Sequence, residues 1–92
     1  SNGPYKFNLS QNYPNPFNPV TFISFSLAEP KPISLSVFNM LGEKIAVLIN
    51  NEMKEPGNYK LSFNAENFSS GTYFYVLSQG ENLISKKMIL VK

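Results

Sequence analysis

The fold of this chain is decided by one stretch, Tyr13-Pro14-Asn15-Pro16-Phe17-Asn18-Pro19, which holds three of the chain's seven prolines. Each proline fixes its own φ, lacks an N–H, and pushes the preceding residue towards an extended conformation. We therefore expect a stiff connector with no helix and no internal strand ladder. Its asparagines can bond the local backbone. Tyr13 and Phe17 are its only large apolar groups, and we expect them to anchor it to the domain beneath.

The residues on both sides of the connector alternate between apolar and polar side chains, which is typical of half-buried strands. Tyr5–Leu9 predicts a short edge strand, and Val20–Leu27 predicts a second strand. In the second strand, Ile23, Phe25 and Leu27 share one parity and should face the core. A connector followed directly by such a strand indicates the opening of a β-sandwich.

The same alternation continues to the end of the chain. It predicts further strands over Ile33–Asn39, Lys44–Ile49, Tyr59–Phe63, Gly71–Ser78 and Leu83–Val91. Their inward residues should be Ile33, Leu35, Val37, Tyr75, Leu77, Met88 and Leu90, with Tyr73 on the same face as Tyr75 and Leu77. The fourth strand has a blurred pattern, in which Ile45, Val47 and Ile49 compete with Leu48 for the core; a bulge or a strong twist would explain it. Seven short strands predict an all-β fold, a seven-stranded antiparallel β-sandwich of immunoglobulin-like or fibronectin-like type.

Turn signals separate these strands. We expect turns or loops at Ala28–Pro32, where two prolines should exclude a ladder, at Met40–Glu43, at Asn50–Gly57 and at Gln79–Asn82. Gly42 is the expected positive-φ residue of its turn. Phe68 should plug the irregular segment before Gly71. The start of the sixth strand, Gly71-Thr72-Tyr73, is either a tyrosine corner or an ordinary strand opening.

Composition bounds the function. Ninety-two residues are one domain, which we place at 4–92, with residues 1–3 as an expression-tag remnant or linker; we expect an attached N-terminal cargo domain in the parent protein. The net charge is only +2 and arginine is absent, which argues against nucleic-acid recognition. No apolar run is long enough to span a bilayer.

Catalytic groups are scarce. The chain has no histidine, cysteine, arginine or aspartate, and its six glutamates fall in expected turns and loops. Ser85 and Lys87 lie on one face of a strand and could formally make a catalytic Ser-Lys dyad, but no cleft is expected around them. Two solvent-facing strand residues are the simpler interpretation. We expect no enzyme, no metal site and no cofactor.

Two surface features leave alternatives open. Phe22, Phe38, Phe74 and Val76 fall on the outward parity, so they form either a docking face or a second packed face, within the sandwich or against a parent domain. The last strand carries Lys86 and Lys87, with Lys92 at its end. These lysines either protect an edge from unwanted pairing or offer that edge to a receptor by strand addition or electrostatics.

Four pieces of sequence together resemble the C-terminal sorting domain of the bacterial type IX secretion system, type A. They are Leu9–Pro19 followed by Val20–Phe25, Val37–Ile45, Pro56–Tyr59 with Phe63–Ala65 and Phe68–Tyr75, and Lys86–Lys92. Asn39 stands where that family usually has Asp, and Glu43-Lys44 where it often has Arg-Glu. These changes put in doubt only a role that needs an acidic residue at position 39.

The resemblance implies a seven-stranded immunoglobulin-like sandwich that acts as a targeting module. It implies a secreted or cell-surface protein of the Bacteroidetes group, whose cargo crosses the periplasm and then the outer membrane through the translocon. A sortase-like surface peptidase would then remove the domain, and the cargo would be attached to the surface or released. The alternative is a non-catalytic accessory sandwich of a secreted enzyme, either carbohydrate-binding or a structural spacer.

We expect the translocon to read two regions, the connector and the last strand. The candidate recognition residues are Tyr13, Pro14, Asn15, Pro16, Phe17, Asn18, Pro19, Gly42, Lys86, Lys87, Met88 and Lys92. We expect no contact with nucleic acid and no membrane insertion.

Overall fold

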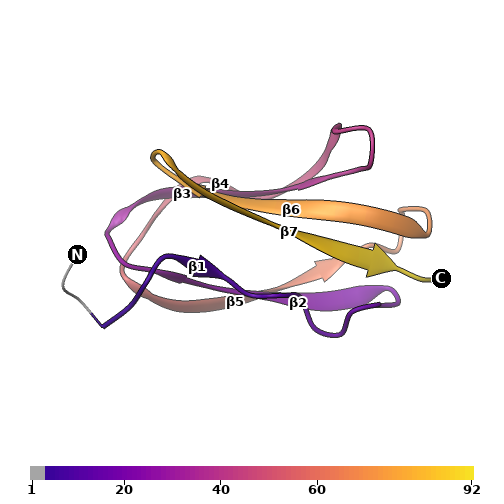
Figure 1. Cartoon of the computed structure of the whole chain (residues 1–92), viewed down its shortest axis with the longest axis horizontal. Helices are drawn as coiled ribbons and strands as arrows, with labels where there is room; N and C mark the ends of the chain where they lie inside the picture. The colour runs from indigo at the N-terminus through magenta and orange to yellow at the C-terminus, as the bar shows by residue number, and fades with distance from the viewer. Residues whose placement is uncertain (1–3) are drawn as a thin grey trace.

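The computed structural model describes residues 4–92 and shows an all-β sandwich (Figure 1). Our assignment of residues 1–3 as a tag remnant or linker lies outside the described residues. The strands are β1 (Asn8–Leu9), β2 (Val20–Leu27), β3 (Lys31–Phe38), β4 (Lys44–Lys54), β5 (Gly57–Asn64), β6 (Gly71–Gln79) and β7 (Asn82–Leu90). Neighbouring strands in each sheet pair antiparallel, which confirms the predicted fold class.

The strands form two stacked sheets. One sheet has the order β1-β2-β5, and the other has the order β4-β3-β6-β7. Figure 1 shows the four-stranded sheet above the three-stranded one, with β7 and β1 at the near side of the two layers. The turn between β4 and β5 joins the two sheets at the opposite side, since these strands are the far edges of their sheets.

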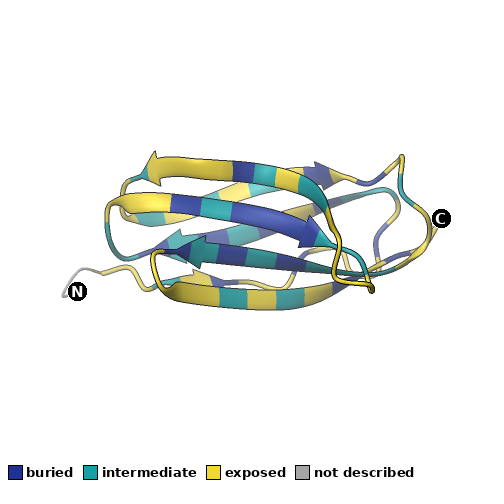
Figure 2. Cartoon of the chain, turned by 90° about the horizontal axis from the view of Figure 1, so that it is seen from above, coloured by how far each residue is buried: buried dark blue, intermediate teal, exposed yellow. Residues whose placement is uncertain are grey.

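The core lies between the sheets and follows the predicted parity. Figure 2 shows buried residues alternating with less buried ones along the strands. Most of the inward residues expected from the sequence are buried; they are Ile23, Phe25, Leu27, Ile33, Leu35, Val37, Tyr75, Leu77, Met88 and Leu90. Tyr73 is half-buried. Of the competing core candidates in β4, Ile49 is buried, Ile45 and Leu48 are half-buried, and Val47 is 51% exposed. Phe68 is half-buried and stacks on Phe63 with ring centroids 6.0 Å apart, so it plugs one end of the core as predicted.

The first strand is shorter than expected. Only Asn8 and Leu9 pair with β2, opposite Ser26 and Phe25. Since β2 ends at Leu27, residues 5 and 6 would lie beyond its end, and the predicted strand over Tyr5–Leu9 is wrong in its first half.

Strands extend into two predicted loops, over the last two residues of Ala28–Pro32 and over most of Asn50–Gly57. β3 begins at Lys31 and includes Pro32, which faces Met53 of β4. Pairing with β6 starts only at Ile33, so Pro32 has a neighbouring strand on one side, where a proline is tolerated. The predicted loop over Asn50–Gly57 is wrong as well, because β4 runs on to Lys54 as an exposed edge that needs no apolar pattern.

The blurred pattern of β4 does reflect an irregular ladder. Its pairing with β3 shifts register at three places, which confirms the predicted bulging. Gly42 has a φ of +83°, as its turn requires, and Gly80 lies in the turn between β6 and β7.

The tyrosine corner is present. Tyr73 donates a hydrogen bond from its hydroxyl to the carbonyl of Ser69, four residues upstream, at 2.6 Å. Tyr59 repeats this arrangement at the start of β5, with its hydroxyl 2.5 Å from the carbonyl of Glu55. Each tyrosine follows a positive-φ glycine by two residues, so one local device opens both strands.

Candidate functional site: the connector and the last strand

The connector, residues 13–19, crosses from one sheet to the other. At its start Tyr13 and Phe22 of β2 exchange two backbone hydrogen bonds, of 3.0 and 2.9 Å. Four residues later Phe17 forms a parallel bridge beside Leu90 of β7. The connector therefore closes one side of the sandwich by joining β2 of one sheet to β7 of the other.

Hydrogen bonds tie this segment to the free edge of β7. The side chain of Gln11, just before the connector, donates to the carbonyl of Lys87 at 2.6 Å. The amide of Ile89 donates to Oδ1 of Asn15 at 2.9 Å. Phe17 donates its amide to the Ile89 carbonyl at 3.0 Å and accepts from the Val91 amide at 2.9 Å. From Lys87 to Val91 the edge of β7 is thus already paired within the domain, and strand addition there would have to displace the connector.

A buried polar network holds the segment just before the connector. Tyr75 places its hydroxyl where it accepts from the Asn12 amide and donates to the Ser10 carbonyl, both at 2.7 Å. Asn12 donates from Nδ2 to Oγ1 of Thr21 at 2.9 Å and to the carbonyl of Pro14 at 3.1 Å. Burial raises the pKa of the Tyr75 hydroxyl to about 12, so the network is neutral at ordinary pH.

Sequence reasoning missed this network, although a signal for it existed. Thr21 shares the inward parity of Ile23 and Phe25, and Tyr75 is inward in β6, so each brings a hydroxyl into the core. Such groups need partners. Every buried side-chain nitrogen and oxygen in residues 4–92 has one.

The predicted recognition residues divide by exposure. The expectation that both aromatic residues anchor the connector is wrong for Tyr13, whose side chain is 79% exposed, and right for Phe17, which is buried. The other exposed members are Pro14, Asn15, Pro16, Asn18, Gly42, Lys87 and Lys92. Pro19 and Lys86 are half-buried, whereas Phe17 and Met88 are part of the core. The fold thus brings the connector residues and the β7 residues together. The side chains of Phe17 and Met88 lie in the core beneath this surface.

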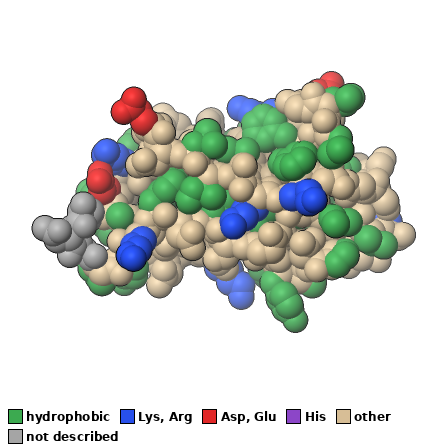
Figure 3. All heavy atoms as spheres, viewed as in Figure 1, with side chains coloured by type: hydrophobic (Ala, Val, Ile, Leu, Met, Phe, Trp, Pro, Cys, Tyr) green, Lys and Arg blue, Asp and Glu red, His purple; other side chains and the backbone are tan. Residues whose placement is uncertain are grey.

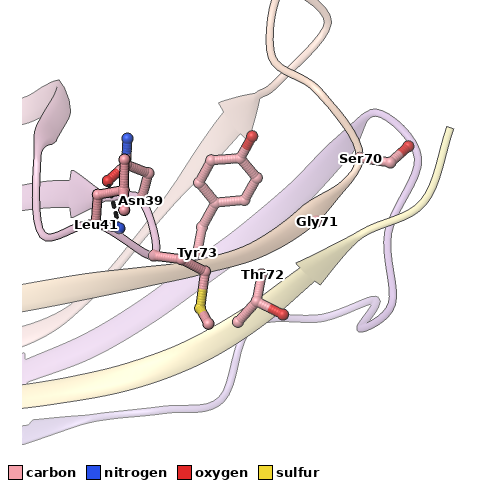
Figure 4. A pocket seen from close by; sticks show the side chains of 7 residues that line it. Asn39, Leu41, Ser70, Gly71, Thr72 and Tyr73 are labelled. Carbon is pink, nitrogen blue, oxygen red and sulfur yellow. Dashed lines mark hydrogen bonds between the residues drawn. The ribbon is translucent and has the colours of Figure 1, made fainter.

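Gly42 lies apart from them, in the turn between β3 and β4. Asn39 organises that turn by accepting at Oδ1 from the amides of Leu41 and Glu43, at 2.9 and 3.0 Å. Beside the turn is a shallow depression of about 220 Å³, lined by Asn39, Met40, Leu41, Ser70, Gly71, Thr72 and Tyr73 (Figure 4).

The depression joins two of the sequence pieces that carry the resemblance. In Figure 4 the Tyr73 ring rises beside the Asn39 turn, while the side chain of Thr72 leaves β6 on the other side. Met40 and Leu41 are 67% and 84% exposed. The turn therefore presents two large apolar side chains to solvent, which the sequence analysis did not anticipate.

Comparison with known families decides what this arrangement belongs to. A family profile described as the secretion system C-terminal sorting domain matches residues 11–92, a span that includes the connector and β7. The chain belongs to this family. The resemblance inferred from the sequence is confirmed. No curated protein matches the chain.

This sorting domain is a C-terminal signal for the type IX secretion system. It therefore interacts with that machinery, and its protein is exported out of the cell, to the surface or in released form. An accessory carbohydrate-binding or spacer role is not favoured by this membership.

Family membership also suggests a non-catalytic role. Within residues 4–92 no group of three or more His, Cys, Asp or Glu side chains could hold a metal ion. The same residues contain no helix with the length and apolar character needed to cross a membrane.

Proposed function

We propose that the type IX machinery recognises the connector and β7 as one folded surface. A single observation supports this proposal: the Ile89 amide donates to the side chain of Asn15, which lies 74 residues away in the sequence. The backbone hydrogen bonds of Phe17 to Ile89 and Val91 extend this contact. We call the connector and β7, joined by these hydrogen bonds, the seam. The two regions that the sequence singled out separately are thus contiguous in the fold.

The exposed side chains of the seam would make the contact. They are Tyr13, Pro14, Asn15, Pro16, Asn18, Lys87 and Lys92. Phe17 and Met88 are buried and would hold the seam from beneath, with the half-buried Pro19 and Lys86 at its margin. Because hydrogen bonds already order the seam, docking would fix few additional torsions, and the entropic cost of binding would be low.

The turn around Gly42 is included as a second contact region. The apolar side chains of Met40 and Leu41 lie beside Gly42 and are exposed. Exposed apolar groups held in a fixed turn suit a protein contact.

The export route forms the rest of the proposal. Residues 4–92 act as one sorting unit behind an N-terminal cargo domain, which reaches the periplasm before the unit directs it through the outer membrane. A sortase-like peptidase at the surface then removes the unit, and the cargo is attached or released. The unit performs no catalysis. Membership of the sorting-domain family supports the export of the cargo by the type IX machinery.

The experiment fuses residues 4–92 to the C-terminus of a fluorescent reporter that carries a signal peptide. The fusion is expressed in a type IX-competent bacterium and in its translocon-null mutant. We expect reporter at the surface or in the medium of the competent strain alone, with the domain trimmed off. Retention in the periplasm of both strains would overturn the proposal, provided that a cognate sorting domain on the same reporter is exported by the competent strain.

A further inference from the structure

The outer faces of the two sheets differ in chemistry. On the three-stranded sheet, Phe22 is followed along β2 by Ser24 and Ser26, and these three residues face Ser62, Lys60 and Asn58 of β5. Such a polar outer face is usual for an antiparallel sheet. The four-stranded sheet instead carries a cluster of apolar residues on its outer face.

The identity of these outward residues follows from burial. Val37 and Tyr75 are fully buried, so their neighbours Phe38, Phe74 and Val76 point away from the core. We define the outer patch as Phe38, Val47, Phe74, Val76 and Ile89. Val47 is 51% exposed and Ile89 is 36% exposed, Phe38, Phe74 and Val76 are half-buried, and none of the five belongs to the hydrophobic core or packs against it. The alternative of a second packed face within the sandwich is therefore wrong for these residues.

Strand register places two lysines at the ends of one row through the outer patch. Lys44 of β4 pairs with Phe38, Phe38 pairs with Phe74, and Phe74 pairs with Lys87 of β7. The ammonium of Lys44 lies 5.9 Å from the centroid of the Phe38 ring, so its charge stays close to the patch. Three strand spacings separate the two lysine backbones, a distance of about 14 Å.

Acidic residues avoid the outer patch. Five of the six glutamates lie in turns or loops outside the strands. One of them, Glu43, lies next to Lys44 in the β3–β4 turn, where it accepts from Nδ2 of Asn39 at 2.7 Å. Glu52 is in β4 but stands opposite Ile33, at the other end of the sheet. In Figure 3, hydrophobic side chains gather over the upper sheet with lysines nearby, and the visible acidic side chains lie at the ends of the molecule.

We propose that the outer patch docks a protein component of the secretion machinery, one that presents apolar side chains between two carboxylates about 14 Å apart. The inference rests on the proposed function for the identity of the partner, while the surface itself follows from the register, the exposure and the charge. Carboxylates of the partner that pair with Lys44 and Lys87, at the rim of the outer patch, would set the orientation of the partner.

The shape of the patch favours a protein over an anionic membrane. Phe38, Phe74 and Val76 are half-buried in a pleated sheet and do not project from it. Insertion into a bilayer interface requires an apolar face that reaches roughly 5–10 Å into the headgroup region. A flat sheet surface with fixed lysines suits another ordered protein surface.

The test places the photoreactive residue p-benzoylphenylalanine at position 74 of the reporter fusion, and separately at position 47 in case the first variant does not fold. The matched control has the same residue at position 58, an exposed position of β5 on the other sheet that faces Ser26 and lies away from the connector. Cells of the competent strain are irradiated during export, and the crosslinked species are identified by mass spectrometry. We expect a crosslink to an outer-membrane component of the secretion machinery from positions 74 and 47, and none from position 58.

Charge reversal tests the rim. In the position-74 fusion, Lys44→Glu with Lys87→Glu should lower the crosslinked fraction at least about tenfold. Lys6→Glu with Lys60→Glu makes the same change in net charge away from the patch, and it should leave the crosslink intact. An equal loss of crosslinking with both pairs would overturn the specific role of Lys44 and Lys87 in binding.

Other occupants give distinct outcomes. A crosslink to the cargo, to a second copy of the chain or to lipid would overturn the proposal. A second experiment mixes the purified domain with vesicles of equimolar phosphatidylcholine and phosphatidylglycerol. Binding to these vesicles that is abolished by Lys44→Glu with Lys87→Glu would also overturn the proposal. Export of the unmodified fusion without any crosslink from positions 74 and 47 would overturn this surface and leave the sorting function standing. Failure of the unmodified fusion to be exported would count against the proposed function instead.

Discussion

Replacing Tyr75 with phenylalanine would show how strongly the core holds the segment before the connector. The Tyr75 ring is fully buried, and phenylalanine fills the same space. Only the hydroxyl is lost, and with it the hydrogen bonds to the Asn12 amide and to the Ser10 carbonyl.

The magnitude follows from what remains after the change. Asn12 is 2% exposed, so its amide would be left buried and without a partner, which costs about 1–3 kcal/mol. The carbonyl of Ser10, an exposed residue, can bond water instead. For a domain of this size, about 2 kcal/mol corresponds to a fall in Tm of roughly 8–16 °C.

The assay is urea unfolding of both proteins, with amide hydrogen exchange as a local readout. Exchange should accelerate at Asn12, Ile89 and Val91 beyond what the lower global stability explains. Tyr73→Phe is the control, because the Tyr73 hydroxyl makes one hydrogen bond to an exposed residue, and it should cost less than about 1 kcal/mol. Equal losses in the two variants, or unchanged protection at Ile89, would refute this reasoning.

Three further predictions concern pH and the turns. The raised pKa of Tyr75, about 12 against an ordinary 10, means that the folded state keeps its proton longer than the unfolded state. The protonated Tyr75 hydroxyl therefore contributes its full stabilisation below about pH 10, and this stabilisation is lost as the pH rises towards 12. The difference in unfolding free energy between wild type and Tyr75→Phe should narrow over that range in urea melts. A difference that stays constant would contradict this prediction. Gly71→Ala should lower the unfolding free energy by about 1–3 kcal/mol in thermal unfolding, because the backbone φ is +153°, although no atom lies within 4 Å of the added Cβ. Gly80→Asn should cost much less, because asparagine tolerates the φ of +61° at that position. The reverse order of the two costs would be inconsistent with backbone strain. Asn39→Ala should cost about 1 kcal/mol. Asn39→Asp keeps the acceptor for the Leu41 and Glu43 amides but replaces the Nδ2 donor to the Glu43 carboxylate, so the comparison is made in a Glu43→Gln background, where Asn39→Asp should cost less than Asn39→Ala; calorimetry showing equal costs there would contradict the role of Oδ1.

Much of the fold could be predicted because strand parity reflects burial directly. Ile33, Leu35 and Val37 alternate with serines, and no other face of β3 could enter the core. The edges were harder to predict. Polar residues 50–52 look like a loop, yet β4 needs no apolar pattern where both of its faces meet water.

The candidate site was only partly visible in the sequence. The prolines marked the connector, and the lysines marked the last strand. Their contact depends on a parallel bridge between Phe17 and Leu90, which no local pattern encodes. The outward parity of Phe38 and Phe74 could be predicted, but their alignment with Lys44 and Lys87 depends on the pairing of four strands.

The most direct test of the account compares export with stability in surface variants of the reporter fusion. Tyr13→Ala with Asn18→Ala removes two exposed side chains of the connector, and Leu83→Ala with Glu81→Ala removes two exposed side chains at the other end of β7. Both pairs should leave the unfolding free energy within about 0.5 kcal/mol of wild type. We predict that export falls about tenfold for the connector pair alone, which corresponds to about 1.4 kcal/mol of recognition. Undiminished export of the connector pair, or an equal fall in both pairs, would contradict the claim that this seam is the recognised surface.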